Sequence, residues 1–211
     1  MVIRRIPAAP PAIPRLAGSA EVPDWNDTAL LAALANNDSR AGLVLYDRLI
    51  RIVEWTILRI TGQRLPDHED LVQTAFEQIV ITLYRKRYAQ SCSLTSWAAA
   101  LSCHVALNAV RSQRRHKSLH VETAAAEREP AARVDLESQL DARQTLERVR
   151  AELARMNAGR AEVLVLHEVN GLELSDIARV LGISVAAAQS RLSRGRRELS
   201  ERLAVLGGET P

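Results

Sequence analysis

The stretch GLELSDIARVLGISVAAAQSRLSRGRREL, residues 171–199, decides the fold of the C-terminal part of the chain. A short helix with Ile177 and Leu181 on its inner side is followed by Gly182, which favours the turn that ends a helix. Ser184 can then cap a second, longer helix. Two helices joined by such a turn are typical of a helix-turn-helix, whose second helix can enter the major groove of DNA.

The second helix of this motif is predicted to have two distinct faces. The apolar face recurs at helical spacing and carries Val185, Ala188, Leu192, Leu199 and Leu203. The opposite face is polar, is free to contact DNA, and carries Gln189, Ser190, Ser193, Arg194 and Arg197. The alternative is a helical hairpin with a solvated basic face, which the turn residues and the clustered arginines together disfavour.

Apolar positions before this motif also recur at helical spacing, and alternating β-branched runs are hardly seen. Residues 1–24 hold five prolines, which forbid a regular helix and predict a flexible leader. Four helices are then expected in a first domain over residues 25–115. They start at Asp27 or Thr28, at about 39, after Pro66 and at about Leu94.

Residues 116–138 lack a clean apolar period and contain Pro130, so they are predicted to form a flexible linker. A helix through Leu140 and Leu153 follows, and then another that Asn157 can cap and that ends before Gly171. With the helix-turn-helix, these helices form a second domain over residues 139–206. The predicted fold class is all-α, with two small helical domains joined by a flexible linker.

Composition limits the classes of function. The chain has 211 residues, 47% of them hydrophobic, and a sequence pI near 9.2. Arginines cluster at two sites, which suggests a polyanionic partner. Cys92 and Cys103 are too few for a disulfide framework, and no Cys/His set has zinc spacing, so no metal or cofactor is expected. Without a long apolar run or a signal peptide, the protein is expected to be cytoplasmic and not inserted in a membrane.

Three segments together resemble one family. Residues 162–203 resemble region 4 of the extracytoplasmic-function sigma factors, which belong to the sigma-70 family. DLVQTAF at residues 70–76 and LTSWAAALSCHVALNAVRSQRR at residues 94–115 resemble region 2 of the same proteins. The resemblance implies a transcription initiation factor that carries core RNA polymerase to a promoter and opens it. It also implies three partners: the polymerase (β′ clamp helices and β subunit), promoter DNA and, in some members, an anti-sigma protein.

The resemblance also implies roles for individual residues in polymerase binding and in opening the minus-10 element. In the family the DLVQ helix docks on the β′ clamp helices, which gives polymerase-binding roles to Asp70, Gln73 and Glu77, while Leu71, Ala75 and Ile79 are expected to pack inward. The loop after Tyr84 and the helix after it hold the opened minus-10 strand, with Tyr88, Ser91, Cys92, Asn108, Arg111, Arg114 and Arg115 as candidates. Trp97 shares a helical face with core residues and is expected to be core.

The minus-35 element is assigned to the second domain, to Ser184, Gln189, Ser190, Ser193, Arg194, Arg196 and Arg197. Five positions depart from what is common in the family. Thr74 stands where glutamate is frequent, Ala100 and Cys103 replace arginines, and His104 replaces asparagine. Gln189 stands where lysine or arginine is more usual, and a glutamine can pair with adenine.

Other classes of protein fit the sequence less well. Residues 67–70 are four consecutive titratable residues, which point around a helix rather than at one metal ion, and HEVNG at residues 167–171 lacks the second histidine of a zinc-protease motif. An enzyme is therefore not expected. A sigma-like mimic that binds an anti-sigma protein shares the fold, but the arginines at 194, 196 and 197 favour DNA. A conventional helix-turn-helix regulator leaves the first domain unexplained.

Overall fold

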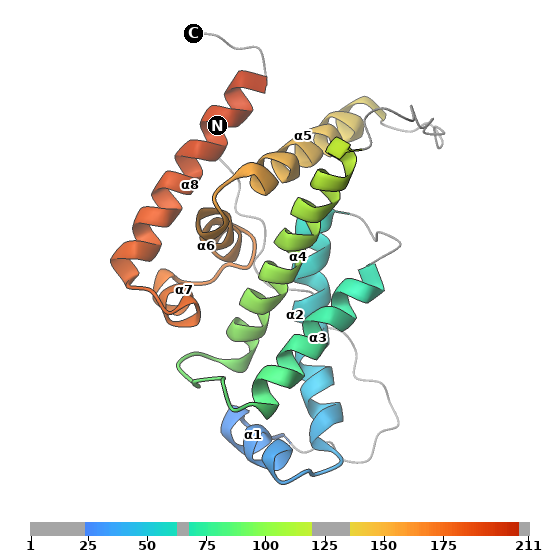
Figure 1. Cartoon of the computed structure of the whole chain (residues 1–211), viewed down its shortest axis with the longest axis vertical. Helices are drawn as coiled ribbons and strands as arrows, with labels where there is room; N and C mark the ends of the chain where they lie inside the picture. The colour runs from blue at the N-terminus through green and yellow to red at the C-terminus, as the bar shows by residue number, and fades with distance from the viewer. Residues whose placement is uncertain (1–23, 63–67, 120–135, 207–211) are drawn as a thin grey trace.

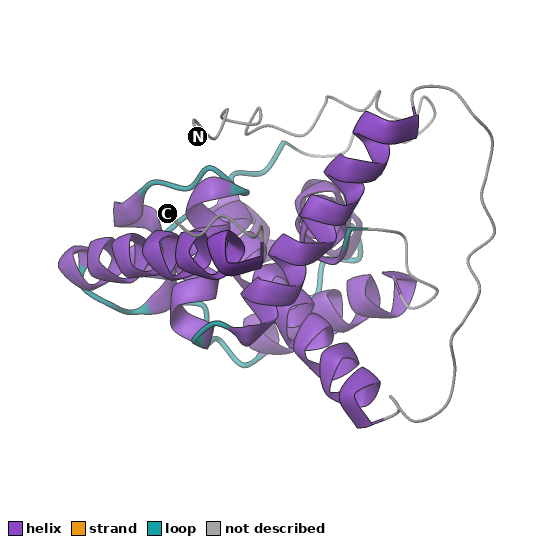
Figure 2. Ribbon diagram, turned by 90° about the horizontal axis from the view of Figure 1, so that it is seen from above, coloured by secondary structure: helices purple, strands orange, loops and turns teal. Residues whose placement is uncertain are grey.

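The computed structural model describes residues 24–62, 68–119 and 136–206, and in these ranges the chain forms eight helices and no strand (Figures 1 and 2). The all-α prediction is confirmed. The helices are α1 (Asp27–Ala35), α2 (Ala41–Thr61), α3 (His68–Tyr84), α4 (Leu94–Leu119), α5 (Leu136–Arg155), α6 (Ala158–Glu168), α7 (Leu174–Leu181) and α8 (Val185–Leu206).

Helices α1 to α4 form the N-terminal domain, in which α2, α3 and α4 pack together and α1 contacts α2. The apolar stripe of α2 supplies Leu49, Val53 and Ile57, all fully buried. Ile79 of α3 and Leu107 of α4 complete the same core. Burial of each such side chain contributes about 1.5–3 kcal/mol to folding, so packing rather than local propensity holds these helices in place.

The start of α1 differs by one residue from the prediction. The cap is Asn26, whose side chain accepts a hydrogen bond from the Ala29 backbone N–H at 2.8 Å. Asp27, one of the two predicted caps, instead accepts hydrogen bonds from Arg48 Nη1 at 2.9 Å and from the Leu94 N–H at 2.8 Å. This carboxylate therefore ties α1 to α2 and satisfies a free N–H at the start of α4.

Helices α5 to α8 form the C-terminal domain, where α8 packs along α6 and α7. The predicted local signals are present in this domain. Asn157 caps α6, because its Oδ1 accepts a hydrogen bond from the Gly159 N–H at 3.1 Å. Ser184 caps α8 in the same way, because its Oγ accepts a hydrogen bond from the Ala187 N–H at 3.1 Å. Gly182 ends α7 with a φ of 63°, a left-handed conformation that favours glycine. The helix-turn-helix is thus formed by α7 and α8.

The two domains lie in contact with each other, with α4 between α2 and α3 on one side and α5, α6 and α7 on the other (Figure 1). Both ends of the predicted linker are helical, since α4 continues to Leu119 and α5 begins at Leu136. The reason is that its terminal residues continue good helix-forming sequence on either side. The rest of the predicted linker and residues 1–23 of the predicted leader lie outside the described residues.

Candidate DNA-binding and polymerase-binding surfaces

The polar face of α8 is available to solvent. Ser184, Gln189, Ser193 and Arg194 are exposed, and Ser190 is half-buried. Opposite them, Ala188 and Leu192 are buried against the rest of the domain, as the helical spacing predicted. A helix held by its apolar side, with amides, hydroxyls and a guanidinium on the other, can offer hydrogen bonds to base edges in a major groove.

The arginines of α8 differ in how they are held. Arg196 donates to the Glu168 carboxylate of α6, with Nε at 2.8 Å, and Arg197 lies 3.7 Å from Glu201 in an exposed pair. Among the described residues Arg194 makes no ion pair. A phosphate approaching α8 would compete with Glu168 or Glu201 for the first two arginines, whereas Arg194 is free to bind it directly.

The outward face of α3 carries Asp70, Gln73 and Glu77, which are all exposed. Gln73 Nε2 donates to Glu77 Oε1 at 2.9 Å, so the two side chains form one polar ridge. On the other side of α3, Ala75 and Ile79 are fully buried. Leu71 is half-buried against the core, so the predicted division of this helix into two faces is confirmed.

The loop between α3 and α4 is fixed by Tyr88. Its hydroxyl donates to the Cys92 carbonyl, and its ring lies 4.9 Å from the half-buried Trp97, which packs against the core. Burial raises the pKa of Tyr88 to about 12 and also raises the pKa of the Cys92 thiol. Neither group is ionised near neutral pH, so each is a neutral hydrogen-bonding group in this loop.

The remaining minus-10 candidates lie on α4. Asn108 is exposed and contacts His104 Nε2 at 2.9 Å, and Arg111 Nη1 donates to Asn108 Oδ1 at 3.4 Å. Arg111 Nη2 is buried and has no hydrogen-bond partner among the described residues. Arg114 and Arg115 are exposed further along the helix. These side chains therefore form a line of donors along α4.

The C-terminal domain contacts both the loop before α4 and α4 itself. Arg179 Nη1 of α7 donates to the Ser91 carbonyl at 3.1 Å, and Glu162 of α6 lies 3.7 Å from His104 Nδ1. Burial raises the pKa of the Glu162 carboxyl above its usual value. Three neighbouring basic residues act in the opposite direction and lower it in part: His104, Arg111 and, from α8, Arg191. In this arrangement α7 contacts the loop before α4, and α6 contacts α4, beside residues predicted to bind the minus-10 strand.

Two further contacts join the domains, and neither involves a candidate DNA-binding residue. Asn170 Nδ2 donates to Thr56 Oγ1 of α2 at 2.7 Å, with both side chains buried. Arg150 of α5 lies directly over Gly62, so a Cβ at position 62 would clash with its guanidinium. These residues, with Arg179 and Glu162, had no local signal in the sequence because each contact joins segments far apart in the chain.

Two of the positions that depart from the family pattern, Ala100 and Cys103, are buried on α4. Ala100 is 5% exposed and Cys103 is fully buried, and burial together with the charge of Glu162 raises the pKa of the Cys103 thiol well above its usual value. A cationic arginine at either position would have to be desolvated here. Small, neutral side chains therefore suit these buried positions on α4.

Within the described ranges, no group of three or more histidine, cysteine and acidic side chains is arranged to hold a metal ion. No helix in the same ranges has the length and apolarity needed to cross a membrane. Cys92 and Cys103 are free thiols.

Comparison with known proteins matches both domains. The family description "Sigma-70 region 2" fits residues 45–116, and "Sigma-70, region 4" fits residues 146–199. The chain is 31% identical over 139 residues to RNA polymerase sigma factor CarQ of Myxococcus xanthus, a match that covers 65% of this chain and 75% of that protein. Over 64 residues it is 41% identical to RNA polymerase sigma factor CnrH of Cupriavidus metallidurans, covering 30% of this chain and 34% of that protein.

The fold is also similar to a solved structure, that of CnrH in complex with the cytosolic domain of CnrY. The similarity covers 87% of this chain and 99% of that one, with a TM-score of 0.53 and 24% identity. A helix-turn-helix whose second helix exposes a polar face is typical of DNA-binding proteins. The chain belongs to the sigma-70 family of RNA polymerase sigma factors, within its extracytoplasmic-function group. This family is not catalytic.

Proposed function

We propose that this sigma factor binds core RNA polymerase through α3 and reads the promoter with two separate surfaces, one on each domain. Asp70, Gln73 and Glu77 contact the β′ clamp helices. The loop before α4 and the donors along α4 hold the opened minus-10 strand, and the polar face of α8 reads the minus-35 element. The factor itself catalyses no reaction and acts in the cytoplasm, where polymerase and promoter DNA are found.

The observation that carries this proposal is the exposed face of α8. Gln189, Ser193 and Arg194 all face solvent, on a helix whose N-terminus is fixed by the Ser184 cap and whose opposite side is buried. Such a helix can be placed in a major groove without rearrangement of the domain. Gln189 suits an adenine, because its amide can donate and accept at once.

The test separates base reading from phosphate binding. Gln189→Ala is expected to relax preference at one base pair of the minus-35 element, with a loss of about 1–3 kcal/mol on the best site. Arg197→Ala is expected to weaken all sites similarly and to reduce the dependence of affinity on salt. Ser200→Ala is the matched control, since Ser200 is exposed on the same side of α8 about three turns further on.

The measurement is the affinity of the holoenzyme for a randomised set of minus-35 sequences at two salt concentrations. Unchanged base preference in Gln189→Ala contradicts the assignment of α8 as the reading helix. A change of preference in Ser200→Ala as large as that in Gln189→Ala contradicts it as well, because the effect would then not depend on position along the helix.

A protein that restrains the factor is a second proposed partner. The solved structure of CnrH, which shares the fold of this chain, is a complex with the cytosolic domain of CnrY. An anti-sigma protein would bind a surface that polymerase also needs, of which the ridge on α3 is one. Co-purification of the chain with a small partner that prevents its binding to core polymerase tests this proposal.

A further inference from the structure

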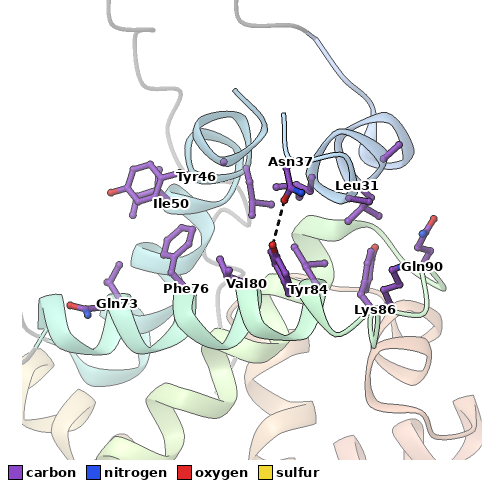
Figure 3. Close-up of a pocket in the computed structure, with 18 of the residues that line it drawn as sticks. Leu31, Asn37, Tyr46, Ile50, Gln73, Phe76, Val80, Tyr84, Lys86 and Gln90 are labelled. Atoms are coloured by element: carbon purple, nitrogen blue, oxygen red, sulfur yellow. Dashed lines mark hydrogen bonds between the residues drawn. The ribbon is translucent and has the colours of Figure 1, made fainter. Parts of the chain in front are cut away.

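A long groove lies between α3 on one side and α1 and α2 on the other (Figure 3). It encloses about 1250 Å³ and is lined mainly by apolar and aromatic side chains, among them Leu31, Ile50, Val72, Phe76 and Val80. Tyr46 and Tyr84, which also line it, are 49% and 76% exposed. Aromatic and apolar surface of this extent on a monomer marks a place where another segment binds.

The part of the chain before α1 has the composition of a ligand for such a groove. Residues 7–14 read PAAPPAIP, which contains two Pro-x-x-Pro repeats, from Pro7 to Pro10 and from Pro11 to Pro14. Proline-rich segments of this kind dock into aromatic-lined grooves, because the fixed φ of proline lowers the entropy lost on binding. Apolar residues suited to contacts with the groove lie within and around the repeats: Ile3, Ile6, Ile13 and Leu16.

Charges at the two ends of the groove match charges along the segment. Glu54 and Glu69 line the groove near the start of α3, and Lys86 lines it beyond the end of α3. In the segment, Arg4 and Arg5 lie far from α1 in the sequence, whereas Glu21 lies close to it. A segment that enters at the Lys86 end would place unlike charges together at both ends.

The position of α1 favours this direction. The Asp27 carboxylate at the start of α1 accepts a hydrogen bond from the Leu94 N–H, so the chain reaches α1 beside the loop that includes Lys86. From residue 23 back to Arg5 an extended proline-rich segment spans about 56 Å at about 3.1 Å per residue. The 17 residues of α3 span only about 26 Å at 1.5 Å per residue, so the segment is long enough to follow the whole groove.

We propose that the proline-rich segment before α1 binds this groove within its own molecule, with Arg4 and Arg5 beside Glu54 and Glu69. The bound segment lies along the side of α3 that carries Gln73, next to the proposed polymerase-binding ridge. Binding of polymerase to α3 then requires the segment to leave. This last consequence rests on the proposed function, whereas the docking itself does not.

Docking is tested in the full-length chain by a nitroxide spin label on Ala9→Cys, in a Cys92→Ser background where the other cysteine, Cys103, is fully buried. The expected result is strong broadening of the methyl signals of Val72 and Val80, with those of Val185 on α8 unaffected. Broadening that appears only when label and isotope are on different molecules indicates a second copy as the occupant and overturns the proposal. Absence of broadening in the groove also overturns it.

A matched pair of substitutions checks that the groove is responsible. Val80 and Ile81 are neighbours on α3 with exposures of 45% and 48%, but only Val80 lines the groove. Val80→Lys puts a positive charge in the groove, where it repels the arginines of the segment (Arg4, Arg5 and Arg15). The segment is then expected to leave the groove, and the broadening at Val72 is expected to disappear. Ile81→Lys is expected to leave it unchanged, and an equal loss in both variants overturns the proposal.

The consequence for polymerase is measured separately, with Arg4→Glu/Arg5→Glu in the full-length chain. If the segment is docked nine-tenths of the time, its release raises the apparent affinity for core polymerase about tenfold. Broadening without any change in this affinity leaves the docking established and contradicts the competition with polymerase. Unchanged binding of the Asp70→Ala/Gln73→Ala variant to core polymerase contradicts the proposed function alone.

Discussion

Replacing Thr56 with valine removes the hydroxyl that joins the two domains through Asn170. Valine has nearly the same shape as threonine, so the packing of α2 is kept while the acceptor for Asn170 Nδ2 is lost. Thr56 is fully buried and Asn170 is 7% exposed, so water does not replace the lost partner. Asn170 Oδ1 is already buried without a partner, and the whole amide is then unsatisfied.

The cost of an unsatisfied buried amide is about 1–3 kcal/mol. Because Asn170 is buried against Thr56 only while the domains are in contact, this cost falls on the closed arrangement and is relieved when the domains separate. A difference of 1.4 kcal/mol is a factor of ten, so the population with separated domains is expected to rise about 5- to 100-fold. Thr56→Val/Asn170→Leu removes both polar groups and is expected to restore most of the closed population.

Labelling of the Cys103 thiol reports this equilibrium. Cys103 is fully buried on α4, close enough to Glu162 of α6 for the carboxylate charge to affect its pKa. Separation of the domains exposes this side of α4, so a thiol reagent with peptide mass spectrometry should label Cys103 about 5- to 100-fold faster in Thr56→Val. An unchanged rate, or an equally fast rate in Thr56→Val/Asn170→Leu, shows that the Asn170–Thr56 hydrogen bond does not hold the domains together.

Three further predictions concern the fold and its pH dependence. Gly182→Ala is expected to lower the free energy of unfolding by about 1–2 kcal/mol, because φ is positive there, whereas Gly42→Ala in α2 raises it by about 0.5–1 kcal/mol; chemical denaturation distinguishes the two signs. The raised pKa of Glu162 means that the folded chain keeps a proton that the unfolded chain releases, so stability increases as pH falls from neutral towards 4.5, and Glu162→Gln should flatten this slope in denaturation curves. Limited proteolysis is expected to cut first between residues 119 and 136 and to give two folded pieces, and a first cut within residues 140–203 contradicts the domain boundary.

Local features of the sequence predicted most of the helices and the faces of α3 and α8. The Ser184 cap, the Gly182 turn and the Asn157 cap act within a few residues, so their signals are complete in the sequence. The start of α1 was displaced by one residue because two adjacent polar side chains can both cap a helix. Asp27 is instead used at the start of α4, through a contact with Leu94 that sequence spacing does not reveal.

The packing of one domain on the other was not predictable from the sequence. It depends on Asn170 with Thr56 and on Arg179 with the Ser91 carbonyl, pairs that are 114 and 88 residues apart. Helical periodicity identifies which side of a helix is buried but not which helix covers it. Cys103 illustrates this limit, since its apolar character was visible in the sequence, whereas its place near Glu162 of α6 was not.

Transcription from a genomic promoter library, reconstituted with core RNA polymerase, tests the central claim most directly. With this protein present, RNA is expected to start at a defined set of promoters that share minus-10 and minus-35 elements. Asp70→Ala/Gln73→Ala is expected to lose these transcripts while keeping its thermal stability, because both side chains are exposed on α3. Start sites identical to those of core polymerase alone would contradict promoter recognition by this protein, and full activity in the double variant would contradict polymerase binding through α3.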